Sequence, residues 1–312
     1  MHAHDLALLR THARTAAHPA AAGPDGCGCA EAVLADREDG TVVRHGPVVV
    51  KAHAPGTGGP AHRARVAVAA DRRLREVLLP PLPSAHGTAV DGRPVTAWPY
   101  GAPVDPGDPD AAPWEEAARL LALLHRTPAP AGLPPMRARV KVALAVERMR
   151  AAGPHPAAGA VLRARETLPA PPAAEAGFLC HGDFHLGQLV RAPGSPGDGS
   201  WRLIDVDDLG TGDPAWDLAR PAAWFAAGLL PPDVWSRFLG AYLAAGGPAV
   251  APDDPWAQLD VPARALTVQT AALAIAKSTA QERSLDEVES VMIDTCVRIG
   301  ALRTELAPPA SP

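Results

Sequence analysis

The chain has 312 residues, and 29 lysines and arginines against 34 aspartates and glutamates leave a formal net charge of −5. With no basic excess and no Lys/Arg run, the chain lacks the charge pattern of a nucleic-acid binder. No apolar run approaches the roughly 18 residues that a membrane span requires, and the N-terminus has no signal-peptide pattern. We therefore expect a cytoplasmic protein with neither nucleic acid nor a membrane as its partner.

The N-terminal part of the chain predicts a small antiparallel sheet with one helix. Residues 3–16 are mildly helical, and the Ala/Gly/Pro-rich residues 17–30 are typical of a connector. Three short β-branched runs separated by Gly-containing turns predict a meander, at 32–36, 41–45 and 48–53. An Arg-rich helix is expected over 61–79, followed by two strands within 85–98.

Helices dominate the remainder of the chain. Apolar residues at helical spacing predict helices at 111–125, 137–151, 215–228, 231–245, 261–282 and 284–304. Short strands are expected at 177–180, 189–191 and 201–206, and residues 152–176 show no clear pattern. The chain therefore favours a β-rich half followed by a larger helical half.

Four cysteines do not predict a disulfide framework in a chain of this length. Cys27 and Cys29 lie near His12 and His18, which is compatible with a metal site. No second Cys pair follows to complete a zinc site, so the sequence favours a Cys-x-Cys without metal in a Gly/Ala-rich segment.

Groups suited to phosphoryl transfer are concentrated between residues 178 and 218. His181, Asp183 and Gln188 lie on one predicted loop, and Asp205 ends the next strand. Phosphoryl transfer needs a carboxylate that orients the attacking hydroxyl and accepts its proton, and oxygen ligands that hold Mg²⁺ on the nucleotide phosphates. In the protein-kinase catalytic loop the metal-binding amide follows the catalytic Asp by five residues, as Gln188 follows Asp183.

These blocks resemble the aminoglycoside phosphotransferase and choline kinase-like superfamily, whose catalytic loop reads His-Gly-Asp-x-x-x-x-Asn and whose later block reads Ile-Asp and then Gly-Asp-Pro-x-x-Asp-Leu. The matching residues here are His181-Gly182-Asp183, Gln188, Ile204-Asp205, Gly212-Asp213-Pro214 and Asp217-Leu218. The resemblance covers residues 31–305 and implies an α+β, two-lobed protein kinase-like fold. It also implies ATP and Mg²⁺ as cofactors and a small-molecule hydroxyl as the acceptor.

By this resemblance, Asp183 is the catalytic base, His181 braces the loop, and Gln188 and Asp205 are the Mg²⁺ ligands. Asp217 is expected to support the loop and to cap its helix rather than to touch substrate. Gln188 replaces the usual Asn, but it still supplies an amide oxygen, and the chain contains no asparagine at all.

The resemblance also implies a division of the chain. It gives an N-terminal extension (1–30), an N-lobe for the nucleotide phosphates (31–97), a C-lobe with the catalytic loop, metal and acceptor site (98–305), and a frayed tail (306–312). The sequence leaves the oligomeric state open between monomer and dimer, and it does not separate ATP from GTP.

Two further residues are candidates for nucleotide binding. Lys51 closes a predicted strand in a chain with three lysines, and the kinase-like fold places such a lysine on the α/β-phosphates. Its glutamate partner is left open, because Glu76 lies late in the helix expected over 61–79. Trp98 lies where the adenine-binding hinge is expected, and it fits that role and a core anchor equally well.

The acceptor is less defined. Asp207 and Asp208 are typical of a solvated acidic turn, and the alternative is that they help to receive a cationic substrate. With Asp213 and the acids of the last helices, they slightly favour a cationic over a neutral hydroxylated acceptor, with an aminoglycoside as the leading class by resemblance alone.

Two other functions fit parts of the pattern. One is a catalytically dead kinase-like nucleotide-binding module, against which Lys51, Asp183, Gln188 and Asp205 argue together. The other is a metallophosphoesterase built on Asp183-x-His185, but such sites usually need a Gly-Asn-His element, which a chain without asparagine cannot supply.

Overall fold

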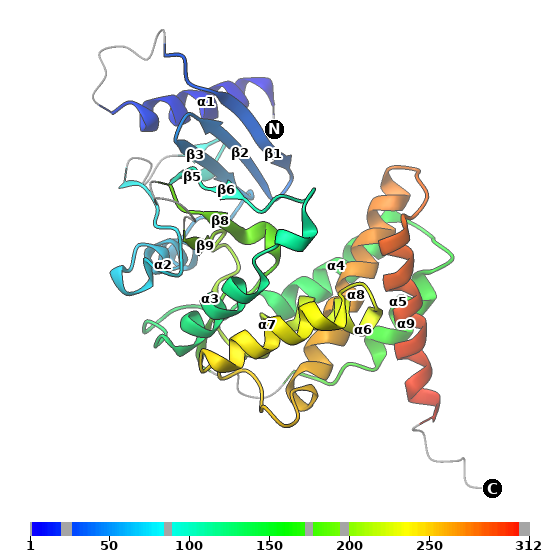
Figure 1. The fold of residues 1–312 in the computed structure, drawn as a ribbon. Helices are drawn as coiled ribbons and strands as arrows, with labels where there is room; N and C mark the ends of the chain where they lie inside the picture. The colour runs from blue at the N-terminus through cyan, green and yellow to red at the C-terminus, as the bar shows by residue number, and fades with distance from the viewer. Residues whose placement is uncertain (1, 20–26, 84–88, 172–176, 194–199, 306–312) are drawn as a thin grey trace, which may run out of the picture. The chain divides into compact units, whose positions relative to one another are not determined.

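The structure, a computed structural model, describes residues 2–19, 27–83, 89–171, 177–193 and 200–305. Its contacts divide the chain into two compact units, each made of three stretches (Figure 1). Unit 1 comprises Met1–Pro113, Pro130–Pro134 and Leu186–Asp207. Unit 2 comprises Trp114–Ala129, Pro135–His185 and Asp208–Pro312. The tail predicted at 306–312 lies outside the described residues.

Unit 1 contains a five-stranded and a three-stranded sheet, both antiparallel. Its helices and strands are α1 (Ala3–Ala17), β1 (Glu31–Arg37), β2 (Gly40–His45), β3 (Val48–His53), α2 (Pro60–Ala69), η1 (Arg72–Leu74), β4 (Ala89–Val90), β5 (Arg93–Pro99), β6 (Ala102–Pro103), η3 (Pro109–Ala111), η4 (Leu186–Gln188), β8 (Leu189–Arg191) and β9 (Trp201–Leu203). The strand orders are β1-β2-β3-β5-β4 and β6-β8-β9. The predicted three-strand meander is confirmed.

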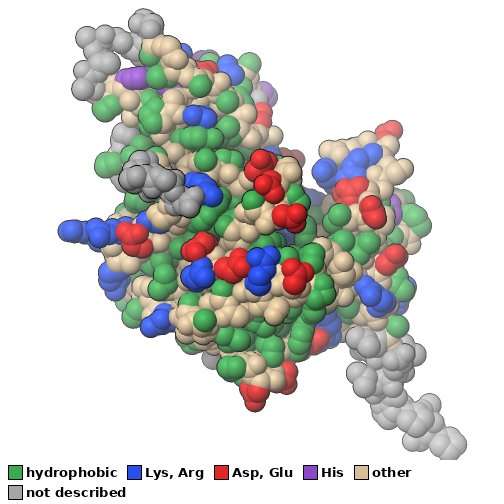
Figure 2. Space-filling view, in the orientation of Figure 1, with side chains coloured by type: hydrophobic (Ala, Val, Ile, Leu, Met, Phe, Trp, Pro, Cys, Tyr) green, Lys and Arg blue, Asp and Glu red, His purple; other side chains and the backbone are tan. Residues whose placement is uncertain are grey.

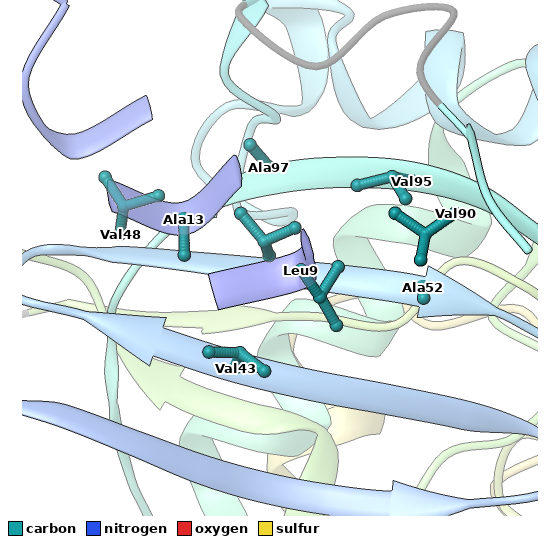
Figure 3. Packing of buried hydrophobic residues seen from close by; sticks show 9 residues of the cluster. Leu9, Ala13, Val43, Val48, Ala52, Val90, Val95 and Ala97 are labelled. Carbon is teal, nitrogen blue, oxygen red and sulfur yellow. The ribbon is translucent and has the colours of Figure 1, made fainter. Parts of the chain in front are cut away.

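Helix α1 covers one face of the five-stranded sheet. Alternate residues of β3, Val48, Val50 and Ala52, are buried, as expected where one face of a strand meets a core. Leu9 and Ala13 lie four residues apart on α1, hence on one helix face, and both are fully buried in the same cluster (Figure 3). The sheet therefore builds its core together with the N-terminal helix.

The helix predicted over 61–79 is shorter in the structure. Helix α2 ends at Ala69, and the Asp71 carboxylate then accepts a hydrogen bond from the Arg73 backbone N–H at 2.9 Å, which caps η1. Beyond η1 the backbone turns to strand-like pairing, since the Leu79 N–H donates to the Leu203 carbonyl at 2.9 Å. Pairing with the last residue of β9 takes the place of the last helical turns.

Unit 2 is mainly helical. Its elements are α3 (Trp114–Arg126), α4 (Ala138–Ala152), α5 (Ala158–Glu166), β7 (Phe178–Cys180), β10 (Gly210–Gly212), η5 (Pro214–Trp216), α6 (Ala219–Ala227), α7 (Pro232–Ala244), α8 (Trp256–Ala280) and α9 (Glu287–Glu305). Helix α8 packs against α4, α5, α6 and α9, while α3 packs against α7. The only sheet among the described residues of this unit pairs β7 with β10.

The helices of unit 2 match the predicted ones closely, and α5 occupies part of the segment that sequence could not assign. None of the helices among the described residues has the length and apolar content needed to cross a membrane. On the face shown in Figure 2, acidic and basic side chains lie interspersed. The mixed α+β composition of small antiparallel sheets and helices agrees with the predicted fold class.

Candidate active site

The loop after β7 is held by one buried carboxylate. Asp217 is 1% exposed and accepts hydrogen bonds from the backbone N–H groups of His181 at 2.6 Å and Gly182 at 2.7 Å. Its Oδ2 also lies 3.0 Å from Nε2 of His125 on α3. The expectation that Asp217 supports the loop is confirmed. The expectation that it caps the next helix is wrong, because Leu218 is the N-cap of α6 and makes no side-chain cap bond.

Glycine is required at the centre of the His-Gly-Asp block. Gly182 has φ +82°, and a Cβ added there would lie 2.2 Å from the carbonyl oxygen of Asp208. On the other side of Asp183, the buried Phe184 ring stacks on Phe238 of α7 with ring centroids 6.2 Å apart. Backbone contacts before Asp183 and an aromatic contact after it therefore fix its position.

The Asp183 carboxylate is held between two cations. Lys141 Nζ on α4 lies 2.6 Å from Oδ2, and Arg220 Nη2 on α6 donates to Oδ1 at 3.1 Å. Burial alone raises the pKa of Asp183, but the charges of Lys141 and Arg220 outweigh it and hold the pKa below its ordinary value. These three side chains line a small hollow that Gln269 of α8 also lines. Asp183 is therefore an ionised carboxylate at the wall of a hollow.

Asp208 shares the lysine with Asp183. Its Oδ2 lies 2.7 Å from Lys141 Nζ, and Arg137 Nη1 lies 3.6 Å from Oδ1. Burial is the largest influence on this carboxyl, and it raises the pKa of Asp208 above its ordinary value. The interpretation of Asp208 as part of a solvated turn is wrong, because its side chain is 15% exposed and paired.

His185 follows closely in the same loop. Burial and the nearby Arg220 charge lower the pKa of His185 to about 4. The imidazole is therefore neutral at physiological pH, and it adds no positive charge to the surroundings of Asp183.

In unit 1, Lys51 joins two carboxylates that follow β9. Its Nζ on β3 donates to Asp205 Oδ1 at 2.7 Å and lies 2.9 Å from Asp207 Oδ2. The Lys51 side chain is 15% exposed, so the ordinary reading of a solvated strand lysine does not apply. Burial lowers the pKa of Lys51, but the two carboxylates outweigh that effect and raise it, so the ammonium stays charged.

Asp207 extends this ion pair into the sheet. Its Oδ1 lies 2.8 Å from His53 Nδ1, and His53 Nε2 lies 2.7 Å from Thr96 Oγ1. Trp98 Nε1–H donates to the same Thr96 hydroxyl at 2.8 Å. Trp98 is thus linked to Lys51 through the side chains of Thr96, His53 and Asp207. The interpretation of Asp207 as a solvated turn residue is therefore wrong, as it is for Asp208.

The two predicted metal ligands lie on adjoining segments of unit 1. Gln188 is buried at the end of η4, and its backbone carbonyl accepts from the Ile204 N–H at 2.9 Å, next to Asp205. Asp205 has φ +62°, in the left-handed region that non-glycine residues rarely adopt. Strained residues of this kind cluster at functional sites. Asp205 stands two residues beyond β9 rather than at the end of the strand.

Glu76, the partner left open for Lys51, binds elsewhere. Its Oε2 accepts from Arg202 Nη2 at 2.6 Å, and its side chain is 67% exposed. The counter-charges of Lys51 are Asp205 and Asp207 instead.

Sequence reasoning missed several members of these networks. Lys141 is one of the three lysines, and the rarity that singled out Lys51 applied equally to it. Arg220 stood among 26 arginines, and His53 among 12 histidines, so composition gave no signal for either. The structure brings Lys51 and Asp205 together in unit 1, and it places Asp183 and His181 in unit 2.

The model of the phosphotransferase enzyme family matches residues 31–259. A search of curated proteins found no match.

Solved structures of small-molecule kinases resemble the chain over nearly its whole length. A choline/ethanolamine kinase family protein from Mesorhizobium loti has 16% identity and a TM-score of 0.58, with 96% of each chain covered. Choline kinase from Cryptosporidium parvum Iowa II has 10% identity and a TM-score of 0.59, covering 94% of this chain and 95% of its own. Spectinomycin phosphotransferase, in complex with ADP and spectinomycin, has 13% identity and a TM-score of 0.52, covering 88% and 93%. At these identities the likeness shows the fold, and it confirms the predicted kinase-like fold.

Proposed function

This chain belongs to the phosphotransferase enzyme family and is a small-molecule kinase with an alcohol group as acceptor, and we propose that it moves the γ-phosphate of ATP to that hydroxyl. The observation that carries the proposal is the Asp183 carboxylate, which Lys141 and Arg220 keep ionised at the wall of a hollow. An ionised carboxylate beside the acceptor is the group that phosphoryl transfer requires of the protein.

Asp183 is assigned the role of orienting the acceptor hydroxyl and taking its proton. Its pKa lies below the ordinary value, so the carboxylate is a weak base. A weak base suffices where bond formation to the acceptor lags behind bond cleavage, since the hydroxyl becomes acidic only late in such a transition state. Lys141 and Arg220 hold the carboxylate in one orientation, and His181 fixes the loop through its backbone bond to Asp217.

Lys51, Trp98, Asp205 and Gln188 are assigned to the nucleotide. Asp205 and Gln188 supply carboxylate and amide oxygens, which suit Mg²⁺, and these two residues would hold the ion. When bound, Mg²⁺ neutralises charge on the phosphates. Lys51 is charged and already lies beside Asp205, which is consistent with a role on the α/β-phosphates.

The acceptor is proposed to be a hydroxylated small molecule, either neutral or cationic. The acids near the loop add little to a cationic preference, because Asp207 pairs with Lys51 and Asp208 with Lys141, while Asp213 caps η5 by accepting from the Ala215 N–H. The solved relatives act on choline, ethanolamine or spectinomycin, so these three compounds form the first acceptor panel.

The test is ATP consumption with this panel for the wild type, Asp183→Asn and the control Asp233→Asn, an exposed aspartate in the first turn of α7. Asp183→Asn should lower turnover by roughly 10² or more, as expected for loss of a general base, while nucleotide binding is retained. Asp233→Asn should match the wild type. Near wild-type turnover of Asp183→Asn contradicts the assigned role. Nucleotide binding without turnover of any acceptor favours the inactive binding module instead.

A further inference from the structure

A group of two cysteines and two histidines gathers in unit 1, apart from the residues assigned to phosphoryl transfer. His18 is the C-cap residue of α1, Cys27 and Cys29 precede β1, and His45 ends β2. One ligand atom from each of the four lies within 4.8 Å of all the others. Sequence spacing pointed to His12 and His18 as the histidines nearest the cysteines, whereas the fold brings in His45 from the sheet.

The spacing of these atoms resembles the edges of a tetrahedral metal site. Cys27 Sγ lies 3.1 Å from His45 Nε2, and Cys29 Sγ lies 3.5 Å from His18 Nε2. Bonds of about 2.3 Å to sulfur and about 2.0–2.1 Å to nitrogen at a tetrahedral angle place the two donor atoms about 3.6 Å apart. For these two pairs, shifts of a few tenths of an ångström would therefore suffice to seat an ion, and the other pairs of ligand atoms lie within 4.8 Å.

His45 also has the outer partner that metal-binding histidines usually have. Its Nδ1 lies 3.4 Å from Glu31 Oε2, the residue opposite it on β1, while Nε2 faces Cys27. Glu31 is in turn held by Arg10 of α1, whose Nε lies 3.1 Å from Oε1. A carboxylate on one ring nitrogen fixes the tautomer that leaves the other nitrogen free to bind a metal. His45 itself is 2% exposed, so its ring is fixed in place.

The backbone next to the cysteines is shaped for close approach. Gly46 has φ +53°, and a Cβ there would lie 3.2 Å from Cys29 Sγ. Its N–H donates to the Ala30 carbonyl at 2.8 Å, which anchors the Cys-x-Cys segment on the turn between β2 and β3. Both thiols are free, Cys27 exposed and Cys29 partly so, and an ion can reach them from solvent.

We propose that His18, Cys27, Cys29 and His45 bind one Zn²⁺ as a structural site. Two thiolates and two imidazoles in tetrahedral array are a donor set that suits zinc, and four protein ligands leave no open position for catalysis. The ion joins the end of α1, the segment before β1 and the end of β2. Histidine side chains are visible at the surface in the region of α1, as Figure 2 shows.

The first experiment measures metal in the full chain, purified with reductant and desalted. Elemental analysis should find about one zinc per chain. After zinc removal, titration with Co²⁺ should give visible d–d bands of a tetrahedral site and a near-ultraviolet thiolate charge-transfer band. The variant Cys27→Ser/Cys29→Ser should lose the charge-transfer band and the bound zinc, whereas Cys296→Ala should keep both. Zinc removal should lower the unfolding midpoint of the wild type but not that of the double variant.

Two histidines on the N-terminal helix provide a matched pair, and Glu31 tests the outer partner. Zinc affinity from chelator competition should fall strongly in His18→Gln and stay at the wild-type value in His12→Gln. Glu31→Gln leaves all four ligands in place and should weaken zinc binding by about 10–100-fold. The proposal is overturned by a wild type without zinc and without a cobalt charge-transfer band, or by equal affinities in His18→Gln and His12→Gln. A Cys27–Cys29 disulfide that takes up no metal after reduction overturns it as well.

Discussion

Replacing Asp217 with asparagine tests how the catalytic loop is held. The carboxylate accepts hydrogen bonds from two buried backbone N–H groups, of His181 and Gly182, and contacts the buried His125 ring. Asparagine has nearly the same shape, but it carries no charge and offers one oxygen in place of two. At least one of the three partners must therefore lose its acceptor, and the remaining bonds become bonds to a neutral group.

The expected loss follows from these contacts. A hydrogen bond to a charged group contributes about 1.5–3 kcal/mol, and a buried donor left without an acceptor costs about 1–3 kcal/mol. We therefore expect Asp217→Asn to lower the free energy of unfolding by about 3 kcal/mol. At about 2–4 °C per kcal/mol, the unfolding midpoint falls by about 10 °C.

Thermal and urea unfolding followed by circular dichroism measure this loss, and Asp213→Asn is the matched control. The control makes the same replacement at a position four residues earlier, where the Asp213 Oδ1 accepts one hydrogen bond, from the Ala215 N–H at 3.0 Å. Because asparagine caps a helix about as well as aspartate does, Asp213→Asn should cost less than about 1 kcal/mol. A difference between the two variants of less than about 1 kcal/mol would refute the assignment of Asp217 as the main anchor of the loop.

The pH dependence gives a second check on Asp217. Burial raises the pKa of Asp217, but the hydrogen bond and charge of His125 outweigh it and hold the pKa below its ordinary value. The stability that depends on this lowered pKa is complete above about pH 4, the ordinary value of an aspartate, and is lost as pH falls through the folded value. The gap between wild type and Asp217→Asn should therefore be constant near neutral pH and shrink in acid. A gap that widens in acid contradicts the sign of the shift.

Three further predictions concern the metal, the loop and the acceptor. Asp205→Ala should weaken Mg²⁺-dependent ATP binding, because it removes a charged ligand. Gln188→Asn should keep part of the activity, whereas Gln188→Ala should lose most of it. Unimpaired Mg²⁺ titrations in all three variants contradict the ligand assignment. Gly182→Ala should lower both turnover and the unfolding midpoint, because its Cβ meets the Asp208 carbonyl at 2.2 Å, and a variant with wild-type values rules out that close approach. Cationic acceptors should lose apparent affinity as salt rises, since attraction between exposed charges is screened over roughly 8–10 Å, whereas salt-independent values favour neutral recognition.

Local sequence patterns predicted most elements of this fold. The meander before Lys51 follows from β-branched runs between Gly-containing turns, and the helices of unit 2 follow from apolar spacing. The end of α2 at Ala69 did not follow, because it depends on a cap at Asp71 and on pairing with Leu203, more than a hundred residues later in the chain. Contacts over such separations leave no local periodicity to detect.

The candidate site shows the same limit. Motif spacing selected Asp183, Gln188 and Asp205 without knowledge of their surroundings. Spacing did not reveal that Lys51 pairs with Asp207 as well as Asp205, since Asp207 lies 156 residues later in the chain. Two adjacent acidic residues are interpreted as solvated from sequence alone when, as for Asp207 and Asp208, their basic partners lie far away in the chain. The proposed zinc ligands show the same limit, because His45 comes from β2 and only the fold brings it to Cys27 and Cys29.

The interleaving of the two units constrains how the protein is made on the ribosome. Each unit is assembled from three separate stretches, and the last stretch of unit 1 ends at Asp207. Lys51 emerges 154 residues ahead of Asp205, so a nascent chain has no counter-ion from that segment for the lysine until long after β3 is synthesised. Burying an unpaired ammonium is costly, and the first sheet cannot reach its final charge balance early. Unit 1 is thus completed only after most of the polypeptide has left the exit tunnel, and a stop codon placed before Leu186 yields a fragment that lacks β8 and β9.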